Sequence, residues 1–470
     1  MTVQPTTRPR LDFHPNSYID PLARVFRLEG QYFRGFFPKQ ADFFRQLLQN
    51  QEVTRLQDQG KLIGCQVVED LDLPEFGLVV KHPLVQTLSF CFEWPMAMLK
   101  RAALLTLEIA QSFCPHGVTL QDATSYNVFF QGTRPIFIDL SSLAPDGSSL
   151  LWPAYGQFCQ FFLFPLYLHA AGKSSAALKL LANSPNGLEG PEVAALLGPL
   201  DKLRLKGYLS RLALPEFMAR HFASLRDRSK MGDKSSELAQ RVDLPAARGR
   251  FLASLQKTVQ AINAPPKPGN WTDYYRETDE QVLARKMSLV ERVFEESRPA
   301  QVVDVGCNLG EFSLLAARHQ ASVIALDSDH DCVNRLYQLA EQEGAEVLPL
   351  VVDALNPSPD LGWLNREYPS LLKRVKGDMV LALALLHHFI FSGGQDFPRS
   401  VQALKAYQAG SLLIEYVDQG DPMTNKLPRR PGVDYAWYNE RVFLQTLEDE
   451  YAKVELLERL SPTRSLYLAA

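Results

Sequence analysis

The stretch VVDVGCNLGEFS, residues 302–313, decides the fold of the C-terminal half of the chain. Its apolar beginning predicts a strand that ends at Asp304, and a turn with Gly306 and Gly310 leads into a predicted helix near Glu311. Glycine lets the backbone turn sharply and approach a ligand, and a helix N-terminus offers free N–H groups with a partial positive charge. Strand, glycine turn and helix in this order are typical of a nucleotide-cofactor pocket.

The spacing of the glycines favours one class of cofactor. A dinucleotide site has the pattern G-x-G-x-x-G, whereas Asn308 stands here where the middle glycine would be. The pattern resembles the first motif of class I methyltransferases that depend on S-adenosylmethionine (SAM), often written D-x-G-x-G-x-G. This resemblance implies that SAM binds at four residues of the stretch: Asp304, Gly306, Asn308 and Gly310.

Two more acids follow predicted strands. ASVIALDSDHD ends a strand at Asp327, where a carboxylate can accept both hydrogen bonds of a ribose diol. AEVLPLVVDAL ends a third strand at Asp353. The resemblance places Asp353 and its neighbour Ala354 beside the adenine. A lone Asp after a strand is more often a turn former, so it is the combination in order that favours a cofactor site.

The apolar strands alternate with helical stretches from about residue 300 onward, which predicts a parallel, doubly wound α/β sheet. VELLERL and SLYLAA predict a closing hairpin. In the class I methyltransferases such a hairpin completes a Rossmann-like sheet of seven strands, and we expect that fold here.

Candidate catalytic residues follow the fourth strand, GDMVLALALLHHF. His387 or His388 is expected to serve as a general base, and we favour His388. The alternative is that the pair only shapes the pocket. The fifth strand leads into a long, proline-rich loop over residues 417–440, which we interpret as a substrate lid. Glu415 and Asp418 are candidates for substrate contact, with Asp421 as a further one.

A second pattern lies in GVTLQDATSYNVFFQGTRPIFIDLSS, residues 117–142. Asp122 and Asn127 are separated by four residues, and Asp139 ends an apolar strand. This spacing resembles the catalytic loop of kinases, in which the first Asp accepts the hydroxyl proton while the Asn and the last Asp hold Mg²⁺. The resemblance implies an α+β kinase-like domain before the methyltransferase sheet. The alternative is a polar turn before a hairpin.

Several departures favour a degenerate kinase-like module over an active kinase. Leu120 and Gln121 stand where kinases carry His and Arg, and the N-terminal region has no glycine-rich phosphate loop. No matching strand lysine is evident, and Arg34 is the candidate for that position. ATP with Mg²⁺ therefore remains only a possible second cofactor, and no other metal is expected.

Kinase-like and methyltransferase modules in tandem resemble a bacterial group related to host-specificity nodulation proteins. The motifs that carry this resemblance are DATSYN, EWP at residues 93–95, DVGCNLGEFS and LALLHHF. The group implies SAM-dependent methylation of a poorly defined acceptor. We expect a small-molecule or saccharide-type acceptor, with the first domain assisting substrate binding or regulation. The alternatives are a bifunctional kinase and methyltransferase, and a non-catalytic SAM-binding scaffold.

Length and composition set the remaining expectations. The 470 residues predict two domains, with a kinase-like domain over residues 1–228, a polar and proline-rich linker over 229–271 and the methyltransferase domain over 272–470. A net charge of −4 without a basic run gives no case for nucleic acid. Without C-x-x-C pairs, a secretory h-region or a membrane-length apolar run, we expect a cytoplasmic protein of undetermined oligomeric state that does not bind membranes.

Overall fold

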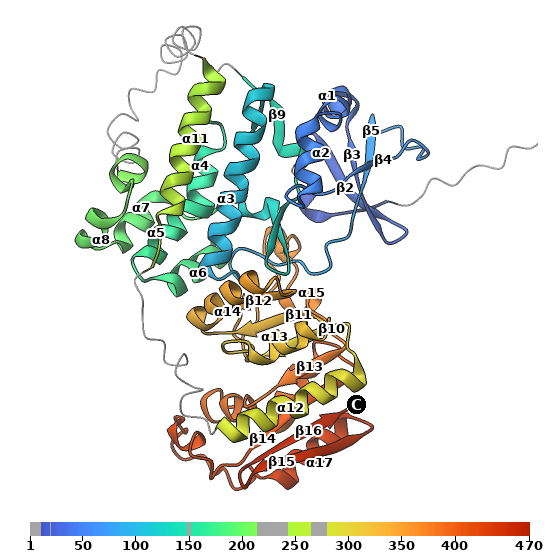
Figure 1. The fold of residues 1–470 in the computed structure, drawn as a ribbon, viewed down its shortest axis with the longest axis vertical. Coiled ribbons are helices and arrows are strands. Elements are labelled where there is room, and N and C mark those ends of the chain that lie inside the picture. The colour runs from blue at the N-terminus through green and yellow to red at the C-terminus, as the bar shows by residue number, and fades with distance from the viewer. Residues whose placement is uncertain (1–10, 19, 148–151, 214–242, 265–279) are drawn as a thin grey trace, which may run out of the picture.

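The computed structural model describes residues 11–18, 20–147, 152–213, 243–264 and 280–470. Figure 1 shows an elongated molecule in which the residues up to 264, here called the N-terminal part, lie at one end. Residues 280–470, here called the C-terminal part, lie at the other end. Among the described helices, none combines the length and the apolar character needed to cross a membrane.

The C-terminal part is built on a mixed sheet of seven strands, in the order β12-β11-β10-β13-β14-β16-β15. The first five in this order run parallel, and β16 is antiparallel to both of its neighbours. The predicted sheet and its closing hairpin are thereby confirmed. The strands are β10 (Gln301–Val305), β11 (Ser322–Asp327), β12 (Val347–Val351), β13 (Met379–Ala382), β14 (Ser411–Val417), β15 (Val454–Ser461) and β16 (Arg464–Ala469).

Helices alternate with these strands because apolar residues recur at helical spacing between them. Asp329 caps the start of α14 and Asn439 caps the start of α17, each accepting a backbone N–H with its side chain. The helices of this part are α12 (Glu280–Ser297), α13 (Glu311–Arg318), α14 (His330–Glu343), α15 (Leu371–Arg374), α16 (Phe397–Lys405) and α17 (Glu440–Glu450).

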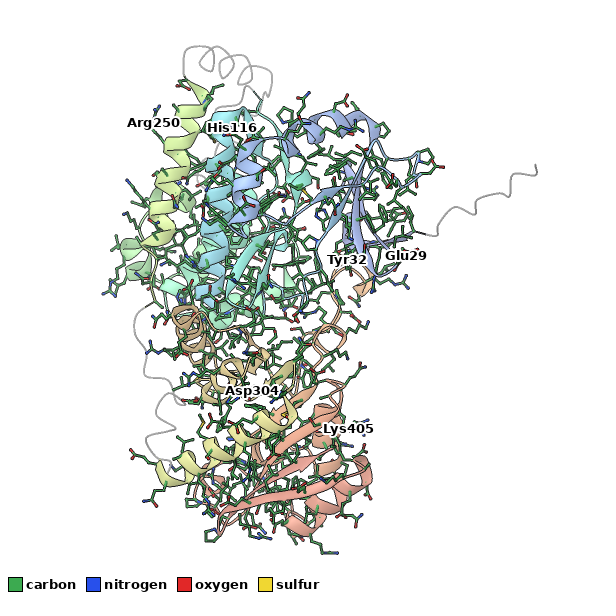
Figure 2. The ribbon with its side chains drawn as sticks, turned by 45° about the vertical axis from the view of Figure 1, so that its right-hand side comes forward. Glu29, Tyr32, His116, Arg250, Asp304 and Lys405 are labelled. Carbon is green, nitrogen blue, oxygen red and sulfur yellow. The ribbon has the colours of Figure 1, made fainter. Side chains whose placement is uncertain are left out.

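The N-terminal part begins with an antiparallel sheet of five strands in the order β1-β2-β3-β5-β4, with two helices after β3. Its strands are β1 (Asp12–Phe13), β2 (Ala23–Leu28), β3 (Gln31–Phe36), β4 (Gln66–Val67) and β5 (Leu78–His82). The two helices are α1 (Pro38–Leu48) and α2 (Gln51–Asp58). Figure 2 shows Glu29 and Tyr32 of the β2–β3 hairpin far from Asp304 of the C-terminal sheet.

A mostly helical unit follows, centred on α3 (Met96–Phe113). Two small ribbons pack beside it, a β7–β8 hairpin and a β6–β9 pair. Their strands are β6 (Val118–Leu120), β7 (Val128–Gln131), β8 (Arg134–Phe137) and β9 (Leu143–Pro145). The remaining helices are α4 (Tyr155–Phe158), α5 (Phe164–Ala170), α6 (Ser174–Asn183), α7 (Gly190–Leu196), α8 (Pro199–Arg204) and α11 (Leu244–Gln260).

Helix α11 lies within the predicted linker over residues 229–271. It packs along α3, as Figure 1 shows, and buries Leu252, Leu255 and Val259 at helical spacing. By this packing the helix belongs to the N-terminal part. Residues 214–242 and 265–279 of the predicted linker region lie outside the described residues.

The two parts are joined where α14 meets the start of α3. Pro95, the residue before α3, has no side chain that can cap the first N–H groups of the helix. The C-terminal part supplies the caps instead. His330 Nε2 accepts from the Met96 N–H at 3.1 Å, and Asn334 Oδ1 accepts from the Ala97 N–H at 2.8 Å.

The EWP segment forms a second junction. The Glu93 carbonyl accepts a hydrogen bond from the Val351 N–H at 2.7 Å, at the end of the edge strand β12. The Glu93 carboxylate pairs with Arg374, whose guanidinium also lies over the Phe90 ring. The side chains of Glu93 and Arg374 are 0% and 3% exposed, so this ion pair is buried between the two parts.

Replacing Glu93 with alanine is expected to destabilise the protein strongly, because it leaves the Arg374 guanidinium buried without its carboxylate. We expect the free energy of unfolding to fall by about 3–5 kcal/mol, measured by urea denaturation. Lys373→Ala is the matched control, since the Lys373 side chain is 64% exposed in its ion pair with Asp360 and a change of at most about 1 kcal/mol is expected. Equal losses in the two variants would contradict a buried junction.

Candidate functional site

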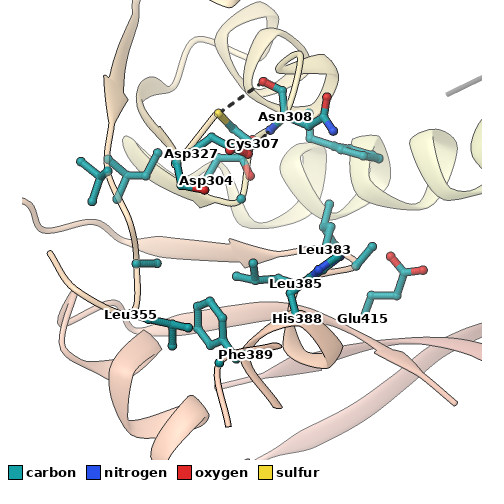
Figure 3. A pocket seen from close by; sticks show the side chains of 18 of the residues that line it. Asp304, Cys307, Asn308, Asp327, Leu355, Leu383, Leu385, His388, Phe389 and Glu415 are labelled. Carbon is teal, nitrogen blue, oxygen red and sulfur yellow. Dashed lines mark hydrogen bonds between the residues drawn. The ribbon is translucent and has the colours of Figure 1, made fainter. Parts of the chain in front are cut away.

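A cavity of 340 Å³ opens at the carboxyl ends of β10, β11, β13 and β14, with residues after β12 and on α12 completing its wall. Parallel α/β sheets place ligands at this edge, because the loops that follow the strands meet there. Figure 3 shows Asp304, Asp327 and Asn308 on one side of the cavity, and Leu385, His388 and Phe389 on the other.

The turn after β10 needs its glycines. Gly306 and Gly310 have φ angles of +78° and +83°, in the left-handed region that favours glycine. A Cβ at Gly306 would lie 2.8 Å from Leu385 Cδ1, and one at Gly310 would overlap the Leu336 side chain. Asn308, between them, also has a positive φ of +50°, which Asn tolerates better than most residues. The replacement of the middle glycine is therefore compatible with the same turn.

Asp304 ends β10 beneath this turn and lines the cavity. Its carboxylate accepts a 2.6 Å hydrogen bond from the Ser313 hydroxyl on α13, which fixes its orientation. Burial raises the pKa of Asp304 to about 7, with a smaller contribution from the neighbouring Asp327. A positively charged group bound in the cavity would favour the ionised carboxylate.

Asp327 projects from the end of β11 into the same cavity. Its two carboxylate oxygens accept backbone hydrogen bonds from Asn308 at 2.9 Å and Asp329 at 2.8 Å. These bonds hold the carboxylate at the cavity wall, although burial raises its pKa. Asp353 and Ala354, after β12, also line the cavity. The structure thus brings all seven predicted cofactor residues except Gly310 to the lining, and Gly310 shapes the turn.

The two histidines differ in position. His388 lines the cavity, whereas His387 is 1% exposed, does not line it, and has no partner for its Nδ1 among the described residues. The two ring centroids are 4.3 Å apart. Burial lowers the pKa of His388 to about 4 and holds the pKa of His387 well below its usual value, so both imidazoles are neutral at pH 7. A neutral imidazole in the cavity is able to accept a proton.

A buried network of charges on the cavity wall was not predicted as a unit. Lys286 of α12 pairs with Glu415 at the end of β14, and all three of Lys286, Glu415 and Arg464 line the cavity. Arg464 donates to both oxygens of Asp421, at 2.8 and 3.1 Å. One feature of the sequence could have indicated a buried charge at Lys286. This lysine falls on the otherwise apolar face of its helix, four residues after Val282.

The other substrate candidates lie in different surroundings. Asp418 accepts from the Tyr416 hydroxyl at 3.2 Å and from the Gly420 N–H at 2.8 Å, and it does not line the cavity. Asp421 fastens the start of the predicted lid to β16 through Arg464 and the Thr463 hydroxyl. This end of the loop is therefore held in place.

The kinase-like candidates of the N-terminal part lie together. Asn127 donates to the Ser142 hydroxyl at 3.0 Å, and Ser142 donates to Asp139. Arg34 of β3 also pairs with Asp139. Burial alone would raise the pKa of Asp139, but Arg34 and the two serine hydroxyls, those of Ser141 and Ser142, hold it below its usual value. Burial raises the pKa of Asp122, and the charge of Asp139 adds to this effect.

Comparisons with known proteins agree with the C-terminal assignment. Residues 275–449 match the methyltransferase-domain family. The nodulation protein NoeA of Rhizobium meliloti (strain 1021) is 28% identical over 442 residues, covering 92% of this chain and 91% of that protein.

Two solved structures show a more distant similarity. Monomeric WbdD is 18% identical with a TM-score of 0.29, covering 42% of this chain and 42% of that one. The magnesium protoporphyrin IX methyltransferase ChlM from Synechocystis PCC 6803, solved with bound SAM, is 15% identical with a TM-score of 0.28, covering 44% and 86%. The match thus spans less than half of WbdD.

The cavity fits SAM, the methyl donor implied by the domain family. Gly306 and Gly310 leave room for a close approach to the backbone, and Asp327 offers an oriented carboxylate for a ribose diol. Asp304 is placed to compensate positive charge. The C-terminal half of this chain is therefore a methyltransferase domain of the SAM-dependent type, in a protein homologous along nearly its whole length to the nodulation protein NoeA.

Proposed function

We propose that this enzyme methylates a small-molecule or saccharide-type acceptor, which binds beside His388, while the N-terminal part assists acceptor binding. The observation that carries the proposal is the shared lining of one cavity. Asp327 lines one side, and His388 and Glu415 line the side across from it, as Figure 3 shows. A donor held on Asp327 and an acceptor held near His388 would therefore face one another in the same enclosure.

The residues that line the cavity suggest how the methyl donor would be held. Asp327 would hold the ribose, and Asp353 and Ala354 would lie beside the adenine. Lys286, which also lines the cavity, would meet the carboxylate at the other end of the donor. The bound donor would supply an electrophilic methyl group on a sulfonium. The apolar side chains of Leu383, Leu385 and Phe389 line the cavity between these charged ends and help to exclude water.

His388 is proposed as the general base. Its imidazole is neutral at pH 7, because burial lowers its pKa to about 4, and it lines the cavity. It would take the proton from an acceptor hydroxyl as the oxygen attacks the methyl group. His387 lies behind it with its ring 4.3 Å away, and we propose that it positions His388.

For the N-terminal part we propose a degenerate kinase-like fold with an assisting role. Support comes from the two helices after β3, and from the loop with Asp122 and Asn127 that precedes the β7–β8 hairpin and Asp139. Both carboxylate oxygens of Asp139 are already engaged, one by Arg34 and Ser141 and the other by Ser142. A metal ion would have to displace these partners, which favours the assisting role over phosphoryl transfer.

Asp327→Ala tests the donor site. Removing an acceptor of two ribose hydrogen bonds should weaken SAM binding by about tenfold to a hundredfold, since a charged hydrogen bond contributes about 1.5–3 kcal/mol. Isothermal titration calorimetry of the full chain measures the affinity. Asp360→Ala is the control, because Asp360 does not line the cavity and binding should be unchanged. An unchanged affinity of the Asp327 variant would place the donor elsewhere.

Asp304 predicts a pH dependence of stability in the ligand-free protein. Its pKa is about 7 when folded and about 4 when unfolded, so its stabilising contribution is complete below about pH 4 and is lost as the pH rises to about 7. Asp304→Asn should remove this decline from the unfolding free energy measured between pH 4 and 8. Asp360→Asn should keep it, because Lys373 lowers the pKa of Asp360 and its contribution changes only at more acidic pH. If the unfolding free energy of Asp304→Asn still falls over this pH range, another titrating group causes the decline.

His388→Gln tests the proposed reaction itself. Transfer of labelled methyl from SAM to a panel of monosaccharide glycosides, their phosphates and phenols is followed for the full chain. We expect the rate of the variant to fall by about 10²–10⁴-fold while SAM affinity is retained. His319→Gln, which alters a histidine paired with Glu291 away from the cavity, should behave as the unchanged protein. An equal rate in His388→Gln would remove His388 as the base, and SAM binding without transfer to any acceptor would favour the scaffold alternative.

A further inference from the structure

A second cavity, of 160 Å³, lies at the junction of the two parts and shares no lining residue with the donor cavity. The N-terminal part contributes Tyr126, next to the kinase-like Asn127, together with Ala182 and Asn183 at the end of α6 and Pro185 just after it. The methyltransferase domain contributes Leu361, Gly362 and Tyr368, from the segment between β12 and α15. Neither part alone forms this cavity.

The wall of this junction cavity is aromatic and well supported. The rings of Tyr126 and Tyr368 stack at 4.3 Å with an angle of 19° between their planes. Phe161 packs edge-on against Tyr126, and Phe90 packs edge-on against both tyrosines. These contacts fix the rings across the junction, so the cavity has a preformed wall and does not depend on rearrangement.

The polar groups of the cavity are neutral. The described lining consists of Tyr126, Ala182, Asn183, Pro185, Leu361, Gly362 and Tyr368, and none of these carries a charge. Within the described residues, neither tyrosine hydroxyl has a hydrogen-bond partner, and the Asn183 amide donates only to the Lys179 carbonyl, at 2.8 Å. The Glu367 carboxylate, which accepts from the Trp363 N–H at 2.8 Å, lies beside Gly362 and would repel an anionic ligand. Two phenol hydroxyls and an amide instead match a ligand that has several hydroxyls.

We propose that the junction cavity binds a neutral sugar ring. The C–H face of a sugar ring is apolar and suits an aromatic wall, while its hydroxyls suit the tyrosine and amide groups. The cavity is smaller than the roughly 300–1,000 Å³ of sites for drug-sized ligands, which fits a single ring. Trp363, the neighbour of Gly362 in the chain, is 73% exposed and adds a second aromatic surface at this segment.

One segment links the two cavities. Residues 353–355 line the donor cavity, and the same chain reaches the junction cavity at Leu361 only six residues after Leu355. A sugar-containing acceptor would thus be held by the N-terminal part and the methyltransferase domain together. That the bound sugar is part of the methyl acceptor rests on the proposed function. That the cavity binds a sugar is independent of it.

Saturation-transfer NMR on the full chain tests the site. The probes are the methyl glycosides of glucose, galactose, mannose and fucose at millimolar concentration, with glucuronate and glucose 6-phosphate as charged comparators. We expect at least one neutral glycoside to bind, and Tyr368→Ala to weaken it about tenfold, the upper range of an aromatic contact. Tyr368→Phe keeps the stacked ring and should lose less. Tyr32→Ala, which alters a tyrosine on the distant β2–β3 hairpin shown in Figure 2, should bind as the unchanged protein does.

SAM calorimetry on the same samples separates the outcomes. If SAM binds and no neutral glycoside does, the junction site is refuted while the methyltransferase proposal stands. If glycosides bind and SAM does not, the proposed function fails and the junction site stands. Preferential binding of the charged sugars, or equal glycoside binding by Tyr368→Ala with its SAM affinity intact, would also overturn the neutral-sugar site.

Discussion

The methyltransferase half depends on a turn in which three of five consecutive residues have a left-handed backbone. Gly306, Asn308 and Gly310 all have positive φ angles, and two of the three positions have no room for a Cβ. This backbone orients the Asn308 N–H toward the carboxylate of Asp327 on the neighbouring strand. The same turn starts α13, whose Ser313 holds Asp304. A single backbone constraint therefore orients both of these carboxylates, which line the same cavity.

The donor site is also tied to the N-terminal part. Asp327 accepts from the Asp329 N–H, and Asp329 caps α14. The next residue, His330, completes the start of α3 across the junction. Between the end of β11 and the start of α14, Asp327 thus lines the proposed donor cavity, Asp329 caps a helix of the same half and His330 caps a helix of the other half. A change in how the two parts pack would therefore alter the position of the Asp327 carboxylate in the cavity.

Much of the C-terminal half could be predicted from sequence because its signals are local. Glycines in a turn, acids at strand ends and alternating apolar runs are read within a few residues of one another. The charged network on the cavity wall was harder to predict, because Lys286 and Glu415 are 129 positions apart and meet only through the fold. The same holds for Glu93 with Arg374, and for Arg34 with Asp139. Helix α11 is a different case, because its sequence favours a helix but does not show that it packs along α3.

The shared capping of α3 bears on how such proteins arise and diversify. Its first two N–H groups find their acceptors on α14, and the exposed end of β12 finds its partner in Glu93. Neither half carries a substitute for these contacts among its own described residues. A chimera in which one half came from a homologue would need contact residues at the junction that match those of the other half. Recombination between relatives should accordingly preserve the pair as a unit, so that the two modules are inherited together.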